Sequence, residues 1–403
     1  MGPMTSSPTR AEDAATLDAA VAAFLAAHPP ASTDRIAFLR ARFDAGLAWI
    51  AYPEGLGGRG LDAALQPDVD RAFAAADAPD NRPQGNVIGL GMAAPTLLRF
   101  GTEAQQRRWL RPLWTGEEIW CQLFSEPGAG SDLAAVATTA RRDGDSWVVN
   151  GQKVWTSLAH ESRWALLLAR TDPMVPKHRG LTYFVADLHA PGVDVRPLRQ
   201  LTGEAEFNEV FLTDVRIPDT DRISEVGNGW RVTQGTLMNE RVAIGGGVAP
   251  RESGPIRALV DAWRGDPAHR HPDRYDAVLD AWVDAEALRL TSARLAQQLE
   301  VGAPGPEGSG LKLAYAALAQ RASSLTLDLL GPEALRYDDW TLRRPDFTSV
   351  PERAPSYRYL RARANSIEGG TSEVMRNIIA ERVLGLPAEP RPDRDTPWKD
   401  LPK

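Results

Sequence analysis

The spacing of apolar residues changes twice along this 403-residue chain. Up to about residue 117 apolar residues recur every three or four positions, which indicates amphipathic helices. Over 118–225 they alternate with polar residues, as in strands with one buried face. Helical spacing returns over 226–387, and a Pro-rich, charged tail, which we expect to be loose, covers 388–403. We therefore expect an α+β protein with a helical domain, a β domain and a helical bundle, in that order.

Capping and helix-breaking residues delimit the helical segments. Glycines in 52–60 interrupt the N-terminal helices, and Thr102 is an N-cap followed by acidic Glu103 in the first turn. Long helices joined by Pro- and Gly-rich loops indicate a bundle in the C-terminal part. The expected helices lie within 10–50 and over 69–76, 90–100, 102–112, 229–245, 253–264, 273–301, 309–330 and 371–385.

The helix at 371–385 has the clearest ends. Thr371 or Ser372 is its N-cap, and Gly385 stops it. The free N–H groups at its beginning suit a phosphate or the edge of a planar cofactor, although an ordinary capped helix has the same signature. Its apolar residues at helical spacing predict an inward face made of Val374, Ile378, Ile379 and Val383.

Glycine and proline separate the expected strands of the middle part. Asn150-Gly151 stands between two apolar runs, which predicts the turn of a β-hairpin. The second strand of that hairpin would carry Trp155 and Ser157 on one face at period two. Short strands at this spacing form a barrel or a sandwich. They are expected at 147–149, 153–157, 164–170, 181–188, 193–201 and 207–217.

Composition narrows the class of protein. A net charge of −7 and a pI near 5.5 argue against nucleic acid or an anionic membrane as a partner. No apolar run approaches the ~20 residues that a membrane span needs. The single cysteine, Cys121, excludes an internal disulfide and suits a reducing cytoplasm. The six histidines lack metal-ligand spacing, so we expect no metal site.

The candidate chemistry begins in the stretch Phe124-Ser-Glu-Pro-Gly-Ala-Gly-Ser-Asp132. It reads as a strand that runs into a turn, in which Gly128 and Gly130 allow backbone angles that a side chain would forbid. Such a turn leaves peptide N–H groups and the hydroxyls of Ser125 and Ser131 facing outward. A flat, polar heterocycle or a diphosphate can dock there, although a merely structural turn has the same composition.

This stretch and the following Asn150-Gly-Gln-Lys-Val-Trp-Thr-Ser157 together resemble the acyl-CoA dehydrogenase family. Further matches are the Pro-Glu-Gly-Leu-Gly-Gly loop from Pro53, the helix after Thr102, the strand Phe207–Pro218 and the helix after Thr371. The resemblance covers residues 35 to 387. It implies an N-terminal helical domain, a middle β-barrel domain and a C-terminal four-helix bundle.

The resemblance also implies FAD as cofactor, lying between the two segments. Trp155 would lie against the isoalloxazine ring and Ser157 would hydrogen-bond the flavin near N5; an ordinary core tryptophan is the alternative for Trp155. Ser131 would touch both cofactor and substrate. The full set of implied FAD contacts is Leu123, Phe124, Ser125, Gly130, Ser131, Trp155, Thr156, Ser157, Thr371 and Glu373.

The family's reaction removes a proton from Cα of an acyl thioester and passes a hydride from Cβ to flavin N5. The proton needs a carboxylate base. The family most often places it where this chain has Gly369; Glu368 lies one residue earlier. Other members carry it on a bundle helix, just before an arginine, where this chain has Glu240 and Arg241.

We expect Glu240 to be the base, because it follows Leu237 and precedes Ile244 on the inward side of its helix. Glu368 is the second candidate, and a buried glutamate paired with arginine is the structural alternative for Glu240. The resemblance implies that Arg241 contacts the acyl-CoA or braces the site. Substrate contacts would come from Ser131, Arg241, Glu368 and Gly369.

Two family motifs that hold the adenine end of FAD across a subunit boundary are absent. The chain has 251–257 and 329–335 in their places, which leaves open whether it forms homo- or hetero-oligomers. The implied partners are an acyl-CoA or carrier-protein thioester and an electron-transfer flavoprotein. Gly245-Gly-Gly247 either makes room for a bulky acyl group or permits close helix packing. A flavin monooxygenase of the same fold and a structural subunit of a heteromeric dehydrogenase are the alternative functions.

Overall fold

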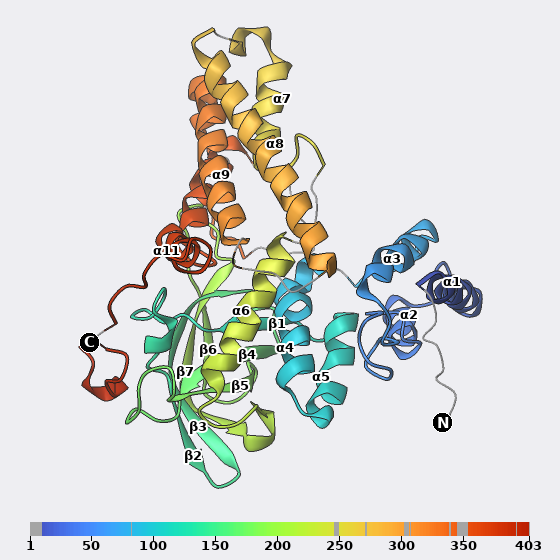
Figure 1. Ribbon diagram of the computed structural model, residues 1–403, viewed down its shortest axis with the longest axis vertical. Coiled ribbons are helices and arrows are strands. Elements are labelled where there is room, and N and C mark those ends of the chain that lie inside the picture. The colour runs from blue at the N-terminus through green and yellow to red at the C-terminus, as the bar shows by residue number, and fades with distance from the viewer. Residues whose placement is uncertain are drawn as a thin grey trace.

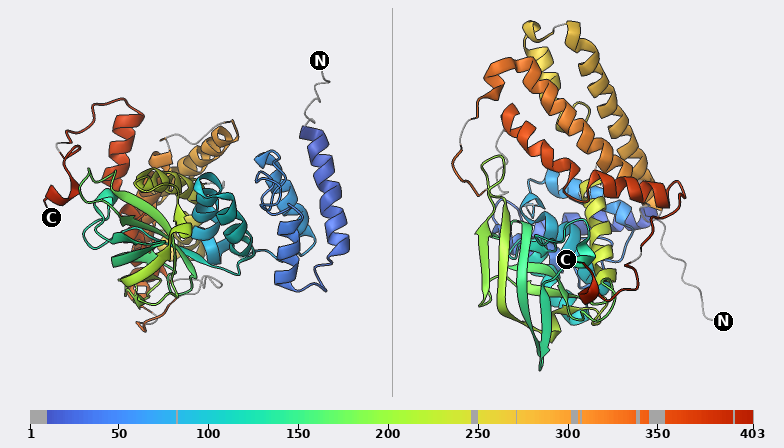
Figure 2. Two further views of the ribbon diagram at one scale, coloured as in Figure 1. Left: turned by 90° about the horizontal axis from the view of Figure 1, so that it is seen from below. Right: turned by 90° about the vertical axis from the view of Figure 1, so that its left-hand side faces the viewer.

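The computed structural model describes residues 10–402 except 82, 246–249, 271, 302–305, 307, 338–339, 345–353 and 392. A curled sheet occupies the middle of the molecule, with short helices on one side and a long bundle rising from it (Figure 1). The first three helices form a group on the side away from the C-terminus (Figure 2). The helices before the sheet are α1 (Arg10–Ala27), α2 (Arg35–Asp44), α3 (Gln66–Ala75), α4 (Ala94–Phe100) and α5 (Glu103–Thr115).

The beginning of α5 forms as its sequence predicts. The Thr102 side chain accepts the N–H of Gln105 at 3.3 Å, and the Gln105 side chain accepts the N–H of Thr102 at 2.9 Å. Gln105 also donates to the carbonyls of Thr220 and Arg222 at 2.7 and 2.9 Å. The same capping residue therefore ties α5 to the end of the sheet.

Strand order in the sheet is β6-β7-β3-β2-β4-β5-β8, and β1 runs parallel to β4. Every residue of β4 is buried, because successive side chains face different cores. Leu166 and Leu168 face the helical core, while Ala165 and Leu167 face the core inside the curled sheet. The strands are β1 (Trp120–Leu123), β2 (Thr139–Asp143), β3 (Ser146–Ser157), β4 (Trp164–Arg170), β5 (Leu181–Asp187), β6 (Val193–Pro197), β7 (Phe207–Pro218) and β8 (Arg222–Ile223).

The predicted hairpin turn at Asn150-Gly151 is wrong. β3 runs through it, and the hairpin between β2 and β3 turns instead at Gly144, whose φ is +62°. The Asn150 amide accepts the N–H of Asp214 at 2.9 Å and donates to its carboxylate at 3.0 Å, at an irregularity in the β3–β7 ladder. Asn-Gly therefore serves a bulge here, not a turn.

The C-terminal helices are longer and extend beyond the sheet (Figure 1). α6 leaves the bundle and packs on the sheet, where the hydroxyl of Thr236 lies 2.9 Å from that of Thr96 and 3.0 Å from that of Tyr183. One helix, α10, was not expected from the sequence. The helices are α6 (Gly229–Gly245), α7 (Arg257–Gly265), α8 (Pro272–Val301), α9 (Gly308–Leu330), α10 (Pro355–Ala362) and α11 (Ser372–Arg382).

Two expectations for the C-terminal end fail. α11 buries Met375, whereas Val383, expected to face inward, is 43% exposed and follows the last helical residue. The tail after Pro387 is docked, not loose: Trp398 donates its backbone N–H to Val175 and its indole N–H to Ala135, at 2.9 and 3.1 Å. Sequence periodicity cannot predict this contact, because the contact joins residues far apart in the chain.

Replacing Gly151 by alanine tests the bulge. A Cβ at this position would stand 2.3 Å from the Thr138 hydroxyl oxygen and 2.7 Å from the Thr138 Cα. We expect Gly151→Ala to lower the free energy of unfolding by about 1–3 kcal/mol, because a backbone atom must move. Urea denaturation measures it. The control is Gly265→Ala, where no atom lies within 4 Å of the new Cβ; equal stability of both variants would contradict the prediction.

Candidate functional site

The turn after β1 is held by its own backbone and presents an open surface. Glu126 and Ala129 exchange backbone hydrogen bonds of 3.1 and 3.0 Å, and the Ser125 carbonyl accepts the N–H of Val154 at 2.9 Å. Gly130 and Ser131 are exposed, and a Cβ added at Gly130 would meet nothing within 4 Å. The turn therefore leaves room for a ligand to lie directly against main chain.

Leu123 and Phe124 contribute almost nothing to this surface. The two residues, backbone included, are 0% and 4% exposed, and their side chains belong to the two cores on either side of the sheet. Ser125, by contrast, is half-buried. Of the implied cofactor contacts in this stretch, the side chains of Ser125 and Ser131 are those that a ligand can touch.

A buried ion pair fixes the turn to β3. The Lys153 ammonium, 0% exposed, lies 2.8 Å from the Glu126 carboxylate and donates to the carbonyls of Phe124 and Leu168 at 3.0 and 2.8 Å. Glu126 also accepts the N–H groups of Ala137 and Thr138 at 2.6 and 2.9 Å. Every oxygen of this carboxylate is therefore engaged, as a buried charge requires.

The environment shifts the pKa of both partners. Burial lowers the pKa of Lys153 to about 8, against the opposing attraction of Glu126. The pKa of Glu126 is also lowered: burial raises it, but the attraction of Lys153 and the hydrogen bonds it accepts outweigh that effect. Both groups are charged at neutral pH, and the pair is structural because it faces no solvent.

Trp155 lies at the other side of the turn and stands out of the sheet. It occupies a second irregularity of β3 with φ of +60°, and its side chain is 58% exposed. The bulge breaks the expected period of two, but Trp155 and half-buried Ser157 both remain accessible. Phe207 supports the indole edge-on, with ring centroids 5.9 Å apart.

Thr156 lies between these two residues and turns inward. Its hydroxyl oxygen is buried and has no hydrogen-bond partner among the described residues. Buried polar atoms of this kind are uncommon in native proteins. It marks the strand end at Ser157 as a place where the fold leaves hydrogen-bonding capacity for another molecule.

An arginine connects this strand end with the loop before α11. Arg361, on α10, contacts both carboxylate oxygens of Glu368, at 3.1 and 3.0 Å. Its Nε lies 3.2 Å from the carboxylate of Glu206, the residue before Phe207. Burial raises the pKa of Glu206, with Arg361 opposing and the nearby carboxylates of Glu204 and Glu368 adding to the rise. The predicted cofactor strand and the predicted substrate loop thus meet at Arg361.

The loop itself has a shape that side chains disfavour. Gly369 and Gly370 have φ of +62° and +93°, and Lys312 of α9 donates to the Gly370 carbonyl at 2.5 Å. Thr371 caps α11, since its hydroxyl accepts the N–H of Val374 at 3.2 Å. This confirms the predicted N-cap. Glu373 is exposed and pairs with Arg376 at 3.4 Å.

The candidate base lies on α6. The helix continues through Glu240 and Arg241 to Gly245, but the side chains of both residues lie outside the described part of the structure. The preceding turns are described: Val232, Thr233 and Thr236 are buried against the sheet and α4.

Three contributors to the site were missed from the sequence: Arg361, Glu206 and Lys312. Arg361 lies in an arginine-rich stretch without a motif, and Glu206 reads as a strand-edge residue. Their charges become meaningful only when α10, α9 and β7 are brought together. No sequence signal in this single chain would have found them.

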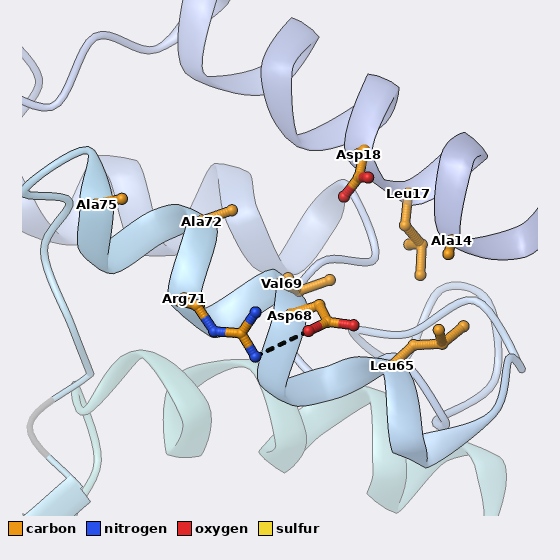
Figure 3. Close-up of a pocket in the computed structure, with 9 residues that line it drawn as sticks. All are labelled: Ala14, Leu17, Asp18, Leu65, Asp68, Val69, Arg71, Ala72 and Ala75. Atoms are coloured by element: carbon orange, nitrogen blue, oxygen red, sulfur yellow. Dashed lines mark ion pairs between the residues drawn. The ribbon is translucent and has the colours of Figure 1, made fainter. Parts of the chain in front are cut away.

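A cavity is present in the N-terminal helices, away from this site. A cavity of about 350 Å³ opens between α1 and α3, lined by small and apolar residues with Asp18 and the Asp68–Arg71 pair at its rim (Figure 3). Across the described ranges, no group of three or more His, Cys, Asp or Glu is placed to hold a metal ion. None of the described helices is long and apolar enough to span a membrane.

Models of the acyl-CoA dehydrogenase domains match consecutive parts of the chain. The N-terminal domain matches residues 11–117, the middle domain 121–215 and the C-terminal domain 227–384. The protein therefore belongs to the acyl-CoA dehydrogenase family, and it is an FAD-dependent oxidoreductase that dehydrogenates acyl-CoA.

Known relatives support this assignment. Acyl-CoA dehydrogenase IpdE1 of Mycobacterium tuberculosis is 41% identical over 350 residues, 86% of each chain. The ChsE4–ChsE5 complex from M. tuberculosis is 27% identical with a TM-score of 0.66, over 96% of this chain and 100% of that one. A glutaryl-CoA dehydrogenase from M. smegmatis, solved with FADH2, shares the fold at 20% identity and a TM-score of 0.66, over 94% and 96% of the chains.

The residues present fit FAD. An exposed indole, an open glycine turn and a buried hydroxyl without a partner lie around one strand end, as a planar, polar ring system requires. Trp155, Ser125, the backbone of 130–131, and Ser157 would hold the flavin there. Bound FAD supplies the hydride acceptor.

Removing the buried carboxylate tests the ion pair. We expect Glu126→Gln to lower the free energy of unfolding by about 3–5 kcal/mol, because it leaves the Lys153 ammonium buried and uncompensated. The double variant Glu126→Gln, Lys153→Met should regain part of the loss. Chemical denaturation of the three proteins measures this. A double variant no more stable than Glu126→Gln would contradict it.

The pH dependence of Glu126→Gln gives a second readout of the same pair. Burial lowers the pKa of Lys153 to about 8 in the folded wild type, and removing the attraction of Glu126 lowers it further. Between that lowered pKa and the ordinary lysine range the unfolded state binds more protons, so the stability of Glu126→Gln should rise with pH from below 8 to the ordinary lysine range. The double variant lacks this rise.

Proposed function

We propose that this protein catalyses α,β-dehydrogenation of an acyl thioester, with Glu240 as the base that takes the α-proton. The observation that supports Glu240 is the state of its competitor, Glu368. Both oxygens of the Glu368 carboxylate contact Arg361, at 3.1 and 3.0 Å. A bidentate pair with arginine fixes both oxygens in place, so neither is free to approach an α-proton.

The backbone of the loop gives a second argument against a base there. Gly369, at the position where the family most often has its base, lies at φ of +62°, and Gly370 at +93°. A Cβ at Gly370 would stand 2.4 Å from the Met375 side chain. The loop conformation suits glycines, which offer main-chain groups and no side chain. We propose that the N–H groups of the loop polarise the thioester carbonyl.

Helical spacing supports α6 as the source of the base. Glu240 follows Thr236 by four residues, and Thr236 is 0% exposed. Residues four apart lie on the same side of a helix. Arg241, the next residue, would bind the acyl-CoA or brace Glu240.

The remaining roles follow from exposure. Trp155 presents its 58%-exposed indole, which would stack on the isoalloxazine ring, and Ser157 would bind the flavin near N5. Ser131, exposed at the turn, would touch cofactor and thioester. The role of Trp155 is checked with a Trp155→Ala variant, which should lose bound FAD. Flavin absorbance of the protein after gel filtration measures this loss.

Glutamine substitution distinguishes the two carboxylates. We expect Glu240→Gln to lower turnover by about 10²–10⁴-fold, the usual contribution of a positioned general base, with FAD still bound. The assay follows anaerobic bleaching of the flavin over a panel of acyl-CoA and carrier-protein thioesters. Bleaching without oxygen also separates a dehydrogenase from a monooxygenase.

Glu368→Gln is the matched control. It keeps the shape of the side chain and one hydrogen bond to Arg361, so turnover should fall far less than in Glu240→Gln. Near-normal turnover of Glu240→Gln together with loss of turnover in Glu368→Gln would move the base to the loop.

We also propose that the protein works as an oligomer in the cytoplasm and passes electrons to an electron-transfer flavoprotein. α8 exposes large apolar side chains on successive turns of one face. ChsE4 and ChsE5 of M. tuberculosis form a complex, which favours a hetero-oligomer as much as a homo-oligomer. The exposed residues are Tyr275, Leu279, Val283 and Leu290, at 45–57%.

A charge on that face tests the oligomer. The chain weighs 43.9 kDa, and light scattering of the purified protein should give a multiple of that mass. Val283→Arg should dissociate it, because an unpaired charge would have to be buried. Val226→Arg, at a 48%-exposed valine outside the bundle, is the control. A monomer that turns over acyl-CoA would refute the proposal.

A further inference from the structure

The segment that follows Ser131 is held by side chains as well as by backbone bonds of its own, which join the N–H of Ala135 to Asp132 and the N–H of Val136 to Leu133 at 2.9 and 3.4 Å. Carbonyls 134 and 136 accept from the Arg170 guanidinium at 2.6 and 3.0 Å. The N–H groups of 137 and 138 donate to Glu126. The carbonyl of Ala135, between them, accepts the indole N–H of Trp398 at 3.1 Å. Five consecutive residues are thus each bound, and the C-terminal tail provides one of these bonds.

The same tail closes over the arginine. Arg170 is 2% exposed, and its guanidinium lies 4.4 Å from the centre of the Trp398 ring. Burial lowers the pKa of Arg170 to about 10, but it stays charged at neutral pH, so the indole face offers a favourable cation–π contact. Trp398 therefore both binds the segment and covers the residue that binds its neighbours.

A second attachment lies next to Ser131 itself. The Lys177 ammonium, on the loop between β4 and β5, bridges Asp132 at 2.8 Å and Asp393 of the tail at 2.7 Å. Backbone bonds from Trp398 and Lys399 to Val175 and Pro173, at 2.9 and 3.1 Å, fix the tail on that loop. The tail is thus linked to the segment directly at Ala135 and, through Lys177, at Asp132.

We propose that residues 393–401 form a strap that positions the Gly130–Asp132 turn for FAD and thioester, with Trp398 as its positioning residue. This rests on the proposed placement of the cofactor at that turn. Trp398 touches neither ligand; it acts through Ala135 and Arg170. The strap restricts a segment with few ladder bonds of its own, so the turn is preorganised before the ligands bind.

The test compares Trp398→Ala with Trp398→Phe and with Lys399→Ala in the full-length protein. Lys399 is exposed and joins the strap through its backbone, so Lys399→Ala is the matched control. Trp398→Phe keeps an aromatic face for Arg170 and loses the N–H. The measurements are the Kd of FAD by flavin fluorescence, KM and kcat for the best thioester, and hydrogen exchange of the amides of 131–138.

Trp398→Ala should raise the Kd of FAD and KM by about tenfold, the size expected for losing one buried hydrogen bond and one cation–π contact, with kcat within about threefold of the wild type. Exchange should speed up in 131–138, and Trp398→Phe should fall between Trp398→Ala and wild type. Lys399→Ala should match the wild type throughout.

Two results overturn the proposal, and they are distinguishable. If Trp398→Ala only lowers the unfolding midpoint while Kd, KM and local exchange match Lys399→Ala, the strap has no positioning role. If wild-type protein binds no FAD, the proposed site fails and the strap fails with it. If the wild type binds FAD and Trp398→Ala has the same Kd, KM and local exchange, the strap is refuted and the proposed site is not.

Discussion

The buried ion pair between Lys153 and Glu126 is the interaction on which the site depends. It joins the turn after β1, the strand β3 and the segment leading to β2, none of which is tied to the others by a continuous ladder. A lysine with 0% exposure is tolerated because two carbonyls and a carboxylate surround its ammonium group. The arrangement fixes the turn to β3 while leaving Ser131 and Trp155 exposed.

A second charged arrangement, centred on Arg361, lies at the loop before α11. Arg361 holds Glu368 and Glu206 together, and thereby brings the glycine loop before α11 to the end of β3. Both carboxylates are paired with the Arg361 guanidinium, and Gly369 has no carboxylate to offer. In the function we propose, the base comes instead from α6, a helix that packs on the sheet through Thr236 and not only on the bundle.

Much of the architecture was predictable because it is local. The ends of α6, the cap of α5 by Thr102 and the cap of α11 by Thr371 follow from short-range patterns, and the structure has all of them. Asn150-Gly151 failed because a bulge and a turn require the same backbone freedom; the neighbouring Asp214 and Thr138 select the bulge. The tail failed for a related reason, since composition predicts solvation but not a distant carbonyl for Trp398 to bind.

The sequence by itself determined the order of helical and β regions, the caps, the cofactor turn and the membership of a flavoprotein family, because each is written in residues close together in the chain. Tertiary structure alone decided which charges meet. Lys153 with Glu126, Arg361 with Glu368 and Glu206, and Trp398 with Arg170 join residues from separate elements. Electrostatic and hydrogen-bond energies depend on distance in space and on burial, and neither quantity can be read from spacing along the chain.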